Sequence, residues 1–150
     1  MKPSKKAITI LVADDDSDDR MMIREALEEN LLANDLRFVE DGEELMDYLL
    51  RLGKYQSPSS SPRPGIILLD LNMPRKDGRE ALKEIKSHAH LRGIPIIVLT
   101  TSKAQEDIFR TYDTGVSSFV TKPVTFDALV AITRSIGNYW FEIVELPIAE

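Results

Sequence analysis

Short apolar runs alternate with longer amphipathic stretches along this chain. The runs cover residues 7–13, 36–39, 66–69, 94–99 and 118–121. Their length and their content of aliphatic and β-branched residues predict strands, and the all-apolar run 66–69 is typical of a strand that is buried on both faces. Five strands that alternate with helices predict an α/β domain, in which helices cover both faces of a parallel sheet.

The stretches between the runs place apolar residues three and four positions apart, which predicts one amphipathic helix after each strand. The expected apolar stripes are Met22, Ile23, Ala26, Leu27 and Leu31; Leu45, Met46, Leu49 and Leu52; Ala81, Leu82 and Ile85; Ile108, Phe109 and Tyr112; and Phe126, Leu129, Val130, Thr133 and Ile136. Asn34, Gly115 and Gly137 are expected to end helices.

Polar residues mark the boundaries of these elements. Ser17 is expected to cap the first helix. Asp16, Asp18 and Asp19 are expected to stabilise the start of this helix. The Ser/Pro-rich stretch 56–64 is expected to be a mobile surface loop without chemistry.

Composition narrows the class of protein. The chain has 150 residues, a net charge of −6 and no cysteine, so we expect one domain without disulfides, thiolate metal sites or cysteine nucleophiles. The negative charge argues weakly against nucleic-acid binding. No apolar run reaches the roughly 20 residues that span a bilayer, and the basic start, residues 1–6, does not resemble a secretory signal. We therefore expect a cytoplasmic protein with a flexible N-terminus.

Polar groups follow four of the predicted strands directly. These groups are Asp14 and Asp15, Asp70, Thr100, and Lys122. Because the carboxyl ends of neighbouring parallel strands share one edge of the sheet, we expect the groups to converge there. Clustered carboxylates suit Mg²⁺ (or Mn²⁺), while Lys122 and Thr100 suit a phosphoryl group. Asp70 would then be free to act as a nucleophile.

The motifs that surround these groups carry a resemblance. They are residues 12–15, 69–74 with Asp77-Gly78, 99–101 and 119–123, and the resemblance covers residues 7–138. The chain resembles a response-regulator receiver domain of two-component signalling. This implies a flavodoxin-like, doubly wound sheet of five parallel strands in the order 2-1-3-4-5, flanked by five helices. Asp70 would accept a phosphoryl group from the phosphohistidine of a sensor histidine kinase.

The resemblance also implies a ligand set for the metal ion. Asp15, Asp70 and the backbone carbonyl of Asn72 would bind Mg²⁺, and Asp14 would act mostly through water. Lys122 would contact the phosphoryl group, and the Lys122–Pro123 peptide bond is expected to be cis.

A switch is implied in the same way. Thr100 would swing toward the phosphoryl group and Phe119 would turn inward with it, although plain core packing of Phe119 is an equal alternative. Asn72 and Ser102 occupy the positions that tune how long the phosphoryl group lasts in receivers. The chain would catalyse only its own phosphotransfer and dephosphorylation, and would not be an enzyme otherwise.

Further stretches resemble the stand-alone regulators that partner bacterial phytochromes. They are the insertion before residue 66, residues 79–86, residues 107–109 and the tail that ends at 145–147. The resemblance implies a phytochrome histidine kinase as partner and a homodimer through the fourth helix, the fifth helix and the tail. With no output domain expected, the signal would leave by contact with another protein.

The apolar C-terminal extension, residues 139–150, leaves two alternatives open. It contains Tyr139, Trp140, Phe141, Ile143 and Val144. These side chains either form a dimer contact or fold back onto the core of the same chain.

Two other functional classes compete with the signalling switch. A phosphatase or mutase with an aspartyl-phosphate intermediate typically has a second Asp two positions after the nucleophile, where this chain has Asn72. A binding module that keeps the site without using it would fail to bind Mg²⁺ or to accept phosphate.

Overall fold

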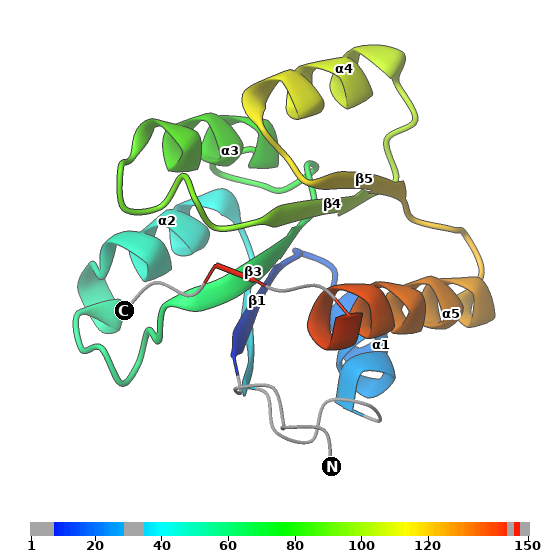
Figure 1. Cartoon of the computed structure of the whole chain (residues 1–150), viewed down its shortest axis with the longest axis horizontal. Coiled ribbons are helices and arrows are strands. Elements are labelled where there is room, and N and C mark those ends of the chain that lie inside the picture. The colour runs from blue at the N-terminus through cyan, green and yellow to red at the C-terminus, as the bar shows by residue number, and fades with distance from the viewer. Residues whose placement is uncertain (1–7, 29–34, 144–145, 148–150) are drawn as a thin grey trace.

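The computed structural model describes residues 8–28, 35–143 and 146–147. Its parallel strands form one sheet in the order β2-β1-β3-β4-β5 (Figure 1). Their bounds are β1 (Thr9–Ala13), β2 (Asp35–Val39), β3 (Pro64–Leu69), β4 (Ile96–Thr100) and β5 (Ser118–Thr121). The predicted fold class, a doubly wound sheet in the order 2-1-3-4-5 with five helices, is confirmed.

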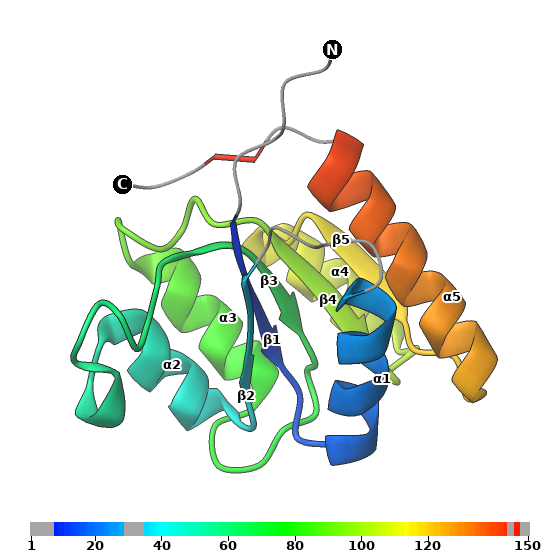
Figure 2. The same ribbon diagram turned by 90° about the horizontal axis from the view of Figure 1, so that it is seen from below.

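Helices cover both faces of the sheet. On one face lie α1 (Ser17–Glu28) and α5 (Phe126–Gly137), which pack against each other; on the other lie α2 (Gly42–Leu50), α3 (Gly78–Ser87) and α4 (Gln105–Thr114) (Figures 1 and 2). Each face has its own core, because successive side chains of a strand point to opposite faces. Leu11 belongs to the core under α2 and α3, whereas Ile10 and Val12 belong to the core under α1 and α5.

The register of the sheet aligns the carboxyl ends of its central strands. Ala13 of β1 pairs with Leu69 of β3, so Asp14 and Asp70 leave the sheet side by side. The amide of Asp70 donates to the carbonyl of Ala13 at 3.0 Å. Every residue of β1 and β3 is buried, which explains why both strands are continuous apolar runs.

The start of α1 follows a side-chain cap, but the capping residue differs from the prediction. The carboxylate of Asp16 accepts from the amides of Asp18 and Asp19, at 2.8 and 3.2 Å, so Asp16 caps α1 and Ser17 is its first residue. An aspartate one position earlier already satisfies the free amides of the first turn. The expected continuation of this helix to Leu31 and Asn34 lies outside the described residues.

The apolar stripe predicted for α4 does not face a core. Phe109 is 73% exposed and Tyr112 is 49% exposed, and Thr111 is the residue that α4 buries. The physical reason is position, since α4 lies over the edge of the sheet beside β5 (Figure 1). Helical spacing alone cannot distinguish a buried stripe from an exposed apolar face.

The Ser/Pro-rich stretch is built into the fold. The Ser61 side chain is buried, and its hydroxyl donates to the carbonyls of Tyr55 and Ser57 at 2.9 and 3.0 Å. The hydroxyl of Tyr48 donates to the carbonyl of Pro62 at 2.7 Å. The expectation of a surface loop is therefore wrong for the second half of the stretch, because Tyr48 of helix α2 and the turn that follows this helix supply hydrogen-bond partners.

The C-terminal segment continues past Gly137 as a π-helical turn, Asn138–Ile143, so Gly137 does not end the helical segment. Trp140 and Leu146 pack against the core under α1 and α5, which supports folding back for these two side chains. Tyr139 stays 54% exposed. Residues 1–6, the predicted flexible terminus, lie outside the described residues, as do residues 144–145 and 148–150. In the part of the chain that the structure describes, no helix is long and apolar enough to cross a membrane.

Candidate functional site

Three carboxylates meet at the carboxyl edge of the sheet. Asp14 and Asp15 follow β1 and Asp70 follows β3, and one oxygen from each lies within 4.8 Å of the others. Asp14 and Asp70 are buried, whereas Asp15 is exposed. The structure thus brings together the acids that the strand pattern singled out. Oxygen donors at this spacing fit a hard divalent cation such as Mg²⁺ or Mn²⁺.

Lys122 lies among these carboxylates. Its Nζ donates to Asp14 Oδ2 at 2.6 Å, to Asp70 Oδ2 at 2.9 Å and to Asp19 Oδ2 at 2.8 Å, and its side chain is only 3% exposed. The sequence predicts only a place at the helix start for Asp19, and the structure adds its contact with Lys122. A first-turn aspartate is typical of helix starts, and only the folded structure, in which α1 packs against α5, shows that this one reaches Lys122.

Burial and charge act in opposite directions on the ionisable groups of the site. Burial raises the pKa of Asp14 to about 6, and the neighbouring Lys122 offsets only part of that effect. For Lys122 itself, burial favours the neutral amine, but Asp14, Asp19 and Asp70 outweigh it and raise its pKa. The ammonium is therefore retained at neutral pH and neutralises part of the acidic cluster.

The carboxylate of Asp70 is held at both oxygens. Its Oδ1 accepts from the hydroxyl of Thr100 at 2.8 Å and from the backbone amide of Asn72 at 3.1 Å. Its Oδ2 accepts from Lys122. The predicted convergence of Asp70, Thr100 and Lys122 is therefore present. The structure contains one position of Thr100, fully buried, so its swing remains a prediction.

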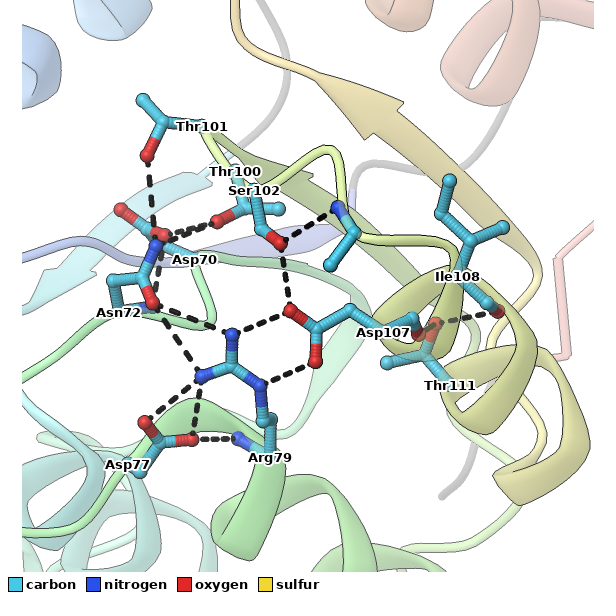
Figure 3. Close-up of polar contacts among 11 residues, drawn as sticks. Asp70, Asn72, Asp77, Arg79, Thr100, Thr101, Ser102, Asp107, Ile108 and Thr111 are labelled. Atoms are coloured by element: carbon cyan, nitrogen blue, oxygen red, sulfur yellow. Dashed lines mark hydrogen bonds and ion pairs between the residues drawn. The ribbon is translucent and has the colours of Figure 1, made fainter.

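A second layer of contacts surrounds the mouth of the site (Figure 3). The side-chain amide of Asn72 lies 3.5 Å from the hydroxyls of Thr100 and Thr101, and its oxygen lies 3.4 Å from Arg79. Ser102, the other position expected to tune the lifetime, donates to Asp107 Oδ2 at 2.6 Å. Sequence reasoning missed the roles of Arg79 and Asp107, since nothing in the local pattern indicates that these residues meet.

Phe119 is half-buried and packs against the core under α2 and α3. Its backbone amide donates to the hydroxyl of Tyr112 at 3.0 Å, which ties β5 to α4. The packing alternative thus describes this structure, and an inward turn of Phe119 stays a prediction.

The expected cis peptide bond is absent. All the described peptide bonds are trans, including Lys122–Pro123, which corrects the expectation. The trans form is intrinsically favoured before proline by about 0.5–1 kcal/mol, and with it Lys122 still reaches all three of its carboxylate partners.

A scan of protein families matches the response regulator receiver domain to residues 10–134. Together with the sheet order and the acidic cluster, this match establishes the class: the chain belongs to the response regulator receiver family, whose members are phosphoacceptor proteins of two-component signalling.

Within that family, the chain is similar to response regulators of cyanobacteria. The chain is 39% identical to response regulator Rcp1 of Synechocystis sp. over 140 residues, which cover 93% of each protein. It superposes with a TM-score of 0.89 on the phosphorylated cyanobacterial phytochrome response regulator RcpA, at 39% identity over 95% of this chain and 99% of that one. The Mn²⁺-bound form of Rcp1 gives 0.89 at 38% identity, over 94% and 99%.

Proposed function

We propose that this protein is a phosphorylatable switch that accepts its phosphoryl group on Asp70. The observation that carries the proposal is the position of the Asp70 carboxylate, which lies between Lys122 and Thr100 and within 4.8 Å of two further acids. In the reaction, a carboxylate oxygen of Asp70 forms a bond to phosphorus while the bond from phosphorus to the histidine nitrogen of a sensor kinase breaks.

The residues divide the work of this transfer. Lys122 neutralises charge on the phosphoryl oxygens, and the hydroxyl of Thr100 donates a hydrogen bond to one of them. Asp15, Asp70 and the backbone carbonyl of Asn72 would hold Mg²⁺ (or Mn²⁺), with Asp14 acting mostly through water. When bound, the cation neutralises charge that develops as the phosphoryl group moves between the two partners.

The donor is proposed to be a histidine kinase of the phytochrome class. The likeness to Rcp1 and to the phytochrome response regulator RcpA, over nearly the whole of each chain, supports this choice. Phosphorylation would draw Thr100 and then Phe119 inward and alter the face formed by α4, β5 and α5. The unknown downstream partner is a protein that binds this face. A cytoplasmic location remains a prediction.

A homodimer is proposed on the same face. Phe109 and Tyr112 on α4 and Tyr139 after α5 are exposed apolar groups, and residues 139–150 are the proposed extension of this contact. The packing of Trp140 and Leu146 onto their own core limits how many tail side chains are free to contribute.

The test is the intact mass after incubation with acetyl phosphate and Mg²⁺. The wild type should gain one phosphoryl group, and Asp70→Asn should gain none while keeping the wild-type circular dichroism spectrum. Asp18→Asn is the matched control, because it changes an exposed carboxylate at the same helix start that makes no contact with Lys122; it should gain one phosphoryl group like the wild type. Labelling of Asp70→Asn at the wild-type rate would contradict the assignment.

A second assay, hydrolysis of p-nitrophenyl phosphate, distinguishes the phosphorylatable switch from a phosphatase. Phosphatases and mutases of this kind use the second Asp, two positions after the nucleophile, as general acid. The chain has Asn72 at that position, and the side-chain amide of Asn72 lies beside Thr100 and Thr101. Turnover of p-nitrophenyl phosphate is therefore expected to be negligible. Failure to bind Mg²⁺ or to accept phosphate from either acetyl phosphate or a kinase would favour the binding-module alternative.

A further inference from the structure

Arg79 joins two helices and the mouth of the phosphoacceptor site. Its Nε and Nη2 donate to the two oxygens of Asp107 at 2.7 Å each, and its Nη1 lies 3.0 Å from Asp77 Oδ2. Because the guanidinium is planar, this bidentate contact fixes its orientation as well as its position. Figure 3 shows the group between the start of α3 and the start of α4.

The same guanidinium holds the side chain of Asn72. Nη1 and Nη2 both lie 3.4 Å from Asn72 Oδ1. With its oxygen directed to Arg79, the amide directs its NH₂ group to the hydroxyls of Thr100 and Thr101, 3.5 Å away. The backbone amide of Asn72 meanwhile contacts Asp70 Oδ1. Arg79 therefore holds the Asn72 side chain beside the hydroxyl of Thr100, which itself donates to Asp70 Oδ1 at 2.8 Å.

The other end of the pair reaches the loop after β4. Asp107 accepts from the Ser102 hydroxyl at 2.6 Å, and the hydrogen bonds from Arg79 and Ser102 lower the pKa of Asp107 to about 2. Both residues expected to tune phosphoryl lifetime, Asn72 and Ser102, are thus attached to one ion pair.

The ion pair is not well suited to a purely stabilising role. The side chain of Arg79 is 36% exposed and that of Asp107 is 17% exposed, and ion pairs that water reaches contribute little to stability. The bidentate contact instead fixes the orientation of the Arg79 guanidinium, and this orientation determines where the Asn72 side-chain amide lies.

We propose that Arg79 is a positioning residue that prolongs the life of the phosphoryl group on Asp70 by holding the Asn72 amide over it. The inference rests on the proposed function. In the step that it slows, a water oxygen forms a bond to phosphorus and the bond from phosphorus to the Asp70 oxygen breaks, which releases inorganic phosphate and restores the carboxylate. An amide fixed beside Asp70 occupies part of the space through which that water approaches.

The test is the rate of phosphoryl loss. Each variant is phosphorylated with acetyl phosphate and Mg²⁺, the donor is removed by desalting, and the decay is followed by intact mass. Arg79→Ala should lose its phosphoryl group about fivefold faster than the wild type, equal to about 1 kcal/mol in the barrier. Arg110→Ala is the matched control. Arg79 and Arg110 both line a small cavity between α3 and α4, but Arg110 pairs with Glu106. This variant should decay at the wild-type rate.

A double-mutant cycle separates positioning from a general structural effect. Because Arg79 acts through Asn72, the double variant Arg79→Ala with Asn72→Ala should decay no faster than Asn72→Ala alone. Additive effects, or an unchanged rate in Arg79→Ala, would overturn the inference. Arg79→Lys keeps the charge but not the fork, so it should decay at an intermediate rate and serves in place of Arg79→Ala if that variant does not fold.

A spectroscopic readout follows the amide directly. The side-chain NH₂ resonance of Asn72 should shift in Arg79→Ala and stay in place in Arg110→Ala. If the wild type accepts no phosphoryl group, the proposed function fails and this inference with it. If the wild type is labelled normally and Arg79→Ala decays like the wild type, only the role of Arg79 is refuted.

Discussion

Among the individual residues of the site, the carboxylates carry more negative charge than Lys122 can neutralise. Lys122 contacts the carboxylates of Asp14, Asp19 and Asp70, and the exposed carboxylate of Asp15 lies beside them. Burial of charges without full compensation is unfavourable. The imbalance makes a divalent cation a favourable addition to the cluster.

One consequence is a pH dependence of Mg²⁺ binding. The pKa of Asp14 is raised to about 6 in the protein without metal, so at pH 5 a cation must displace a proton that is absent at pH 7. The affinity for Mg²⁺ should therefore be roughly tenfold weaker at pH 5 than at pH 7. Isothermal titration calorimetry at the two pH values measures the difference.

The control for this prediction is Asp14→Asn, which removes the titrating group. Its affinity for Mg²⁺ should be lower at pH 7 but change less between the two pH values. Equal wild-type affinity at pH 5 and pH 7 would show that Asp14 does not titrate in this range.

At the scale of elements, the site depends on how closely α3 approaches the end of β3. A Cβ added to Gly78, the first residue of α3, would lie 2.3 Å from the carbonyl oxygen of Asp70 and 2.7 Å from the Cα of Leu71. Both atoms belong to the backbone, so no side chain can move aside. Gly78 thus allows the helix that carries Arg79 to begin directly against the end of β3.

Gly78→Ala should accordingly destabilise the protein by about 2 kcal/mol, the usual cost of forcing a methyl group into a packed region. Gly93→Ala is the matched control, because a Cβ at Gly93 meets nothing within 4 Å. Urea unfolding followed by circular dichroism compares the two variants. Equal midpoints for both variants would mean that the start of α3 can shift without cost.

At the scale of the whole molecule, the two faces of the sheet are covered unequally. The α1 and α5 face receives Trp140 and Leu146 from the C-terminal segment as additional cover, whereas α4 at the far edge leaves Phe109 and Tyr112 exposed. Exposed aromatic side chains that gather on one face mark contact surfaces in folded proteins.

The proposed dimer gives a prediction at this scale. At tens of micromolar, the wild type should sediment as two chains of 17.0 kDa, and replacing Phe109 and Tyr139 by Ser should shift it toward the monomer. Met21→Ser is the control, because Met21 is 60% exposed but lies on α1. A wild type that sediments as a monomer throughout this range would refute the dimer.

Local sequence is sufficient to locate the strands and to predict that their polar ends converge. The central strands β1, β3 and β4 are local runs of mostly apolar residues, and the polar residue at the end of each run marks the edge of the sheet. Asp14, Asp70, Thr100 and Lys122 could therefore be located without a structure. Parallel strands bring their carboxyl ends to one edge whatever the details of packing.

Tertiary packing determines which other side chains reach that edge. Lys122 and Asp19 are 103 positions apart, and Arg79 and Asp107 are 28 positions apart. Their contacts therefore depend on how separate helices and loops pack on the sheet. The same packing exposes the apolar side of α4 and buries Ser61. Periodicity reports the local conformation of a segment, whereas these contacts depend on the free energy of the whole packed molecule, to which distant segments contribute.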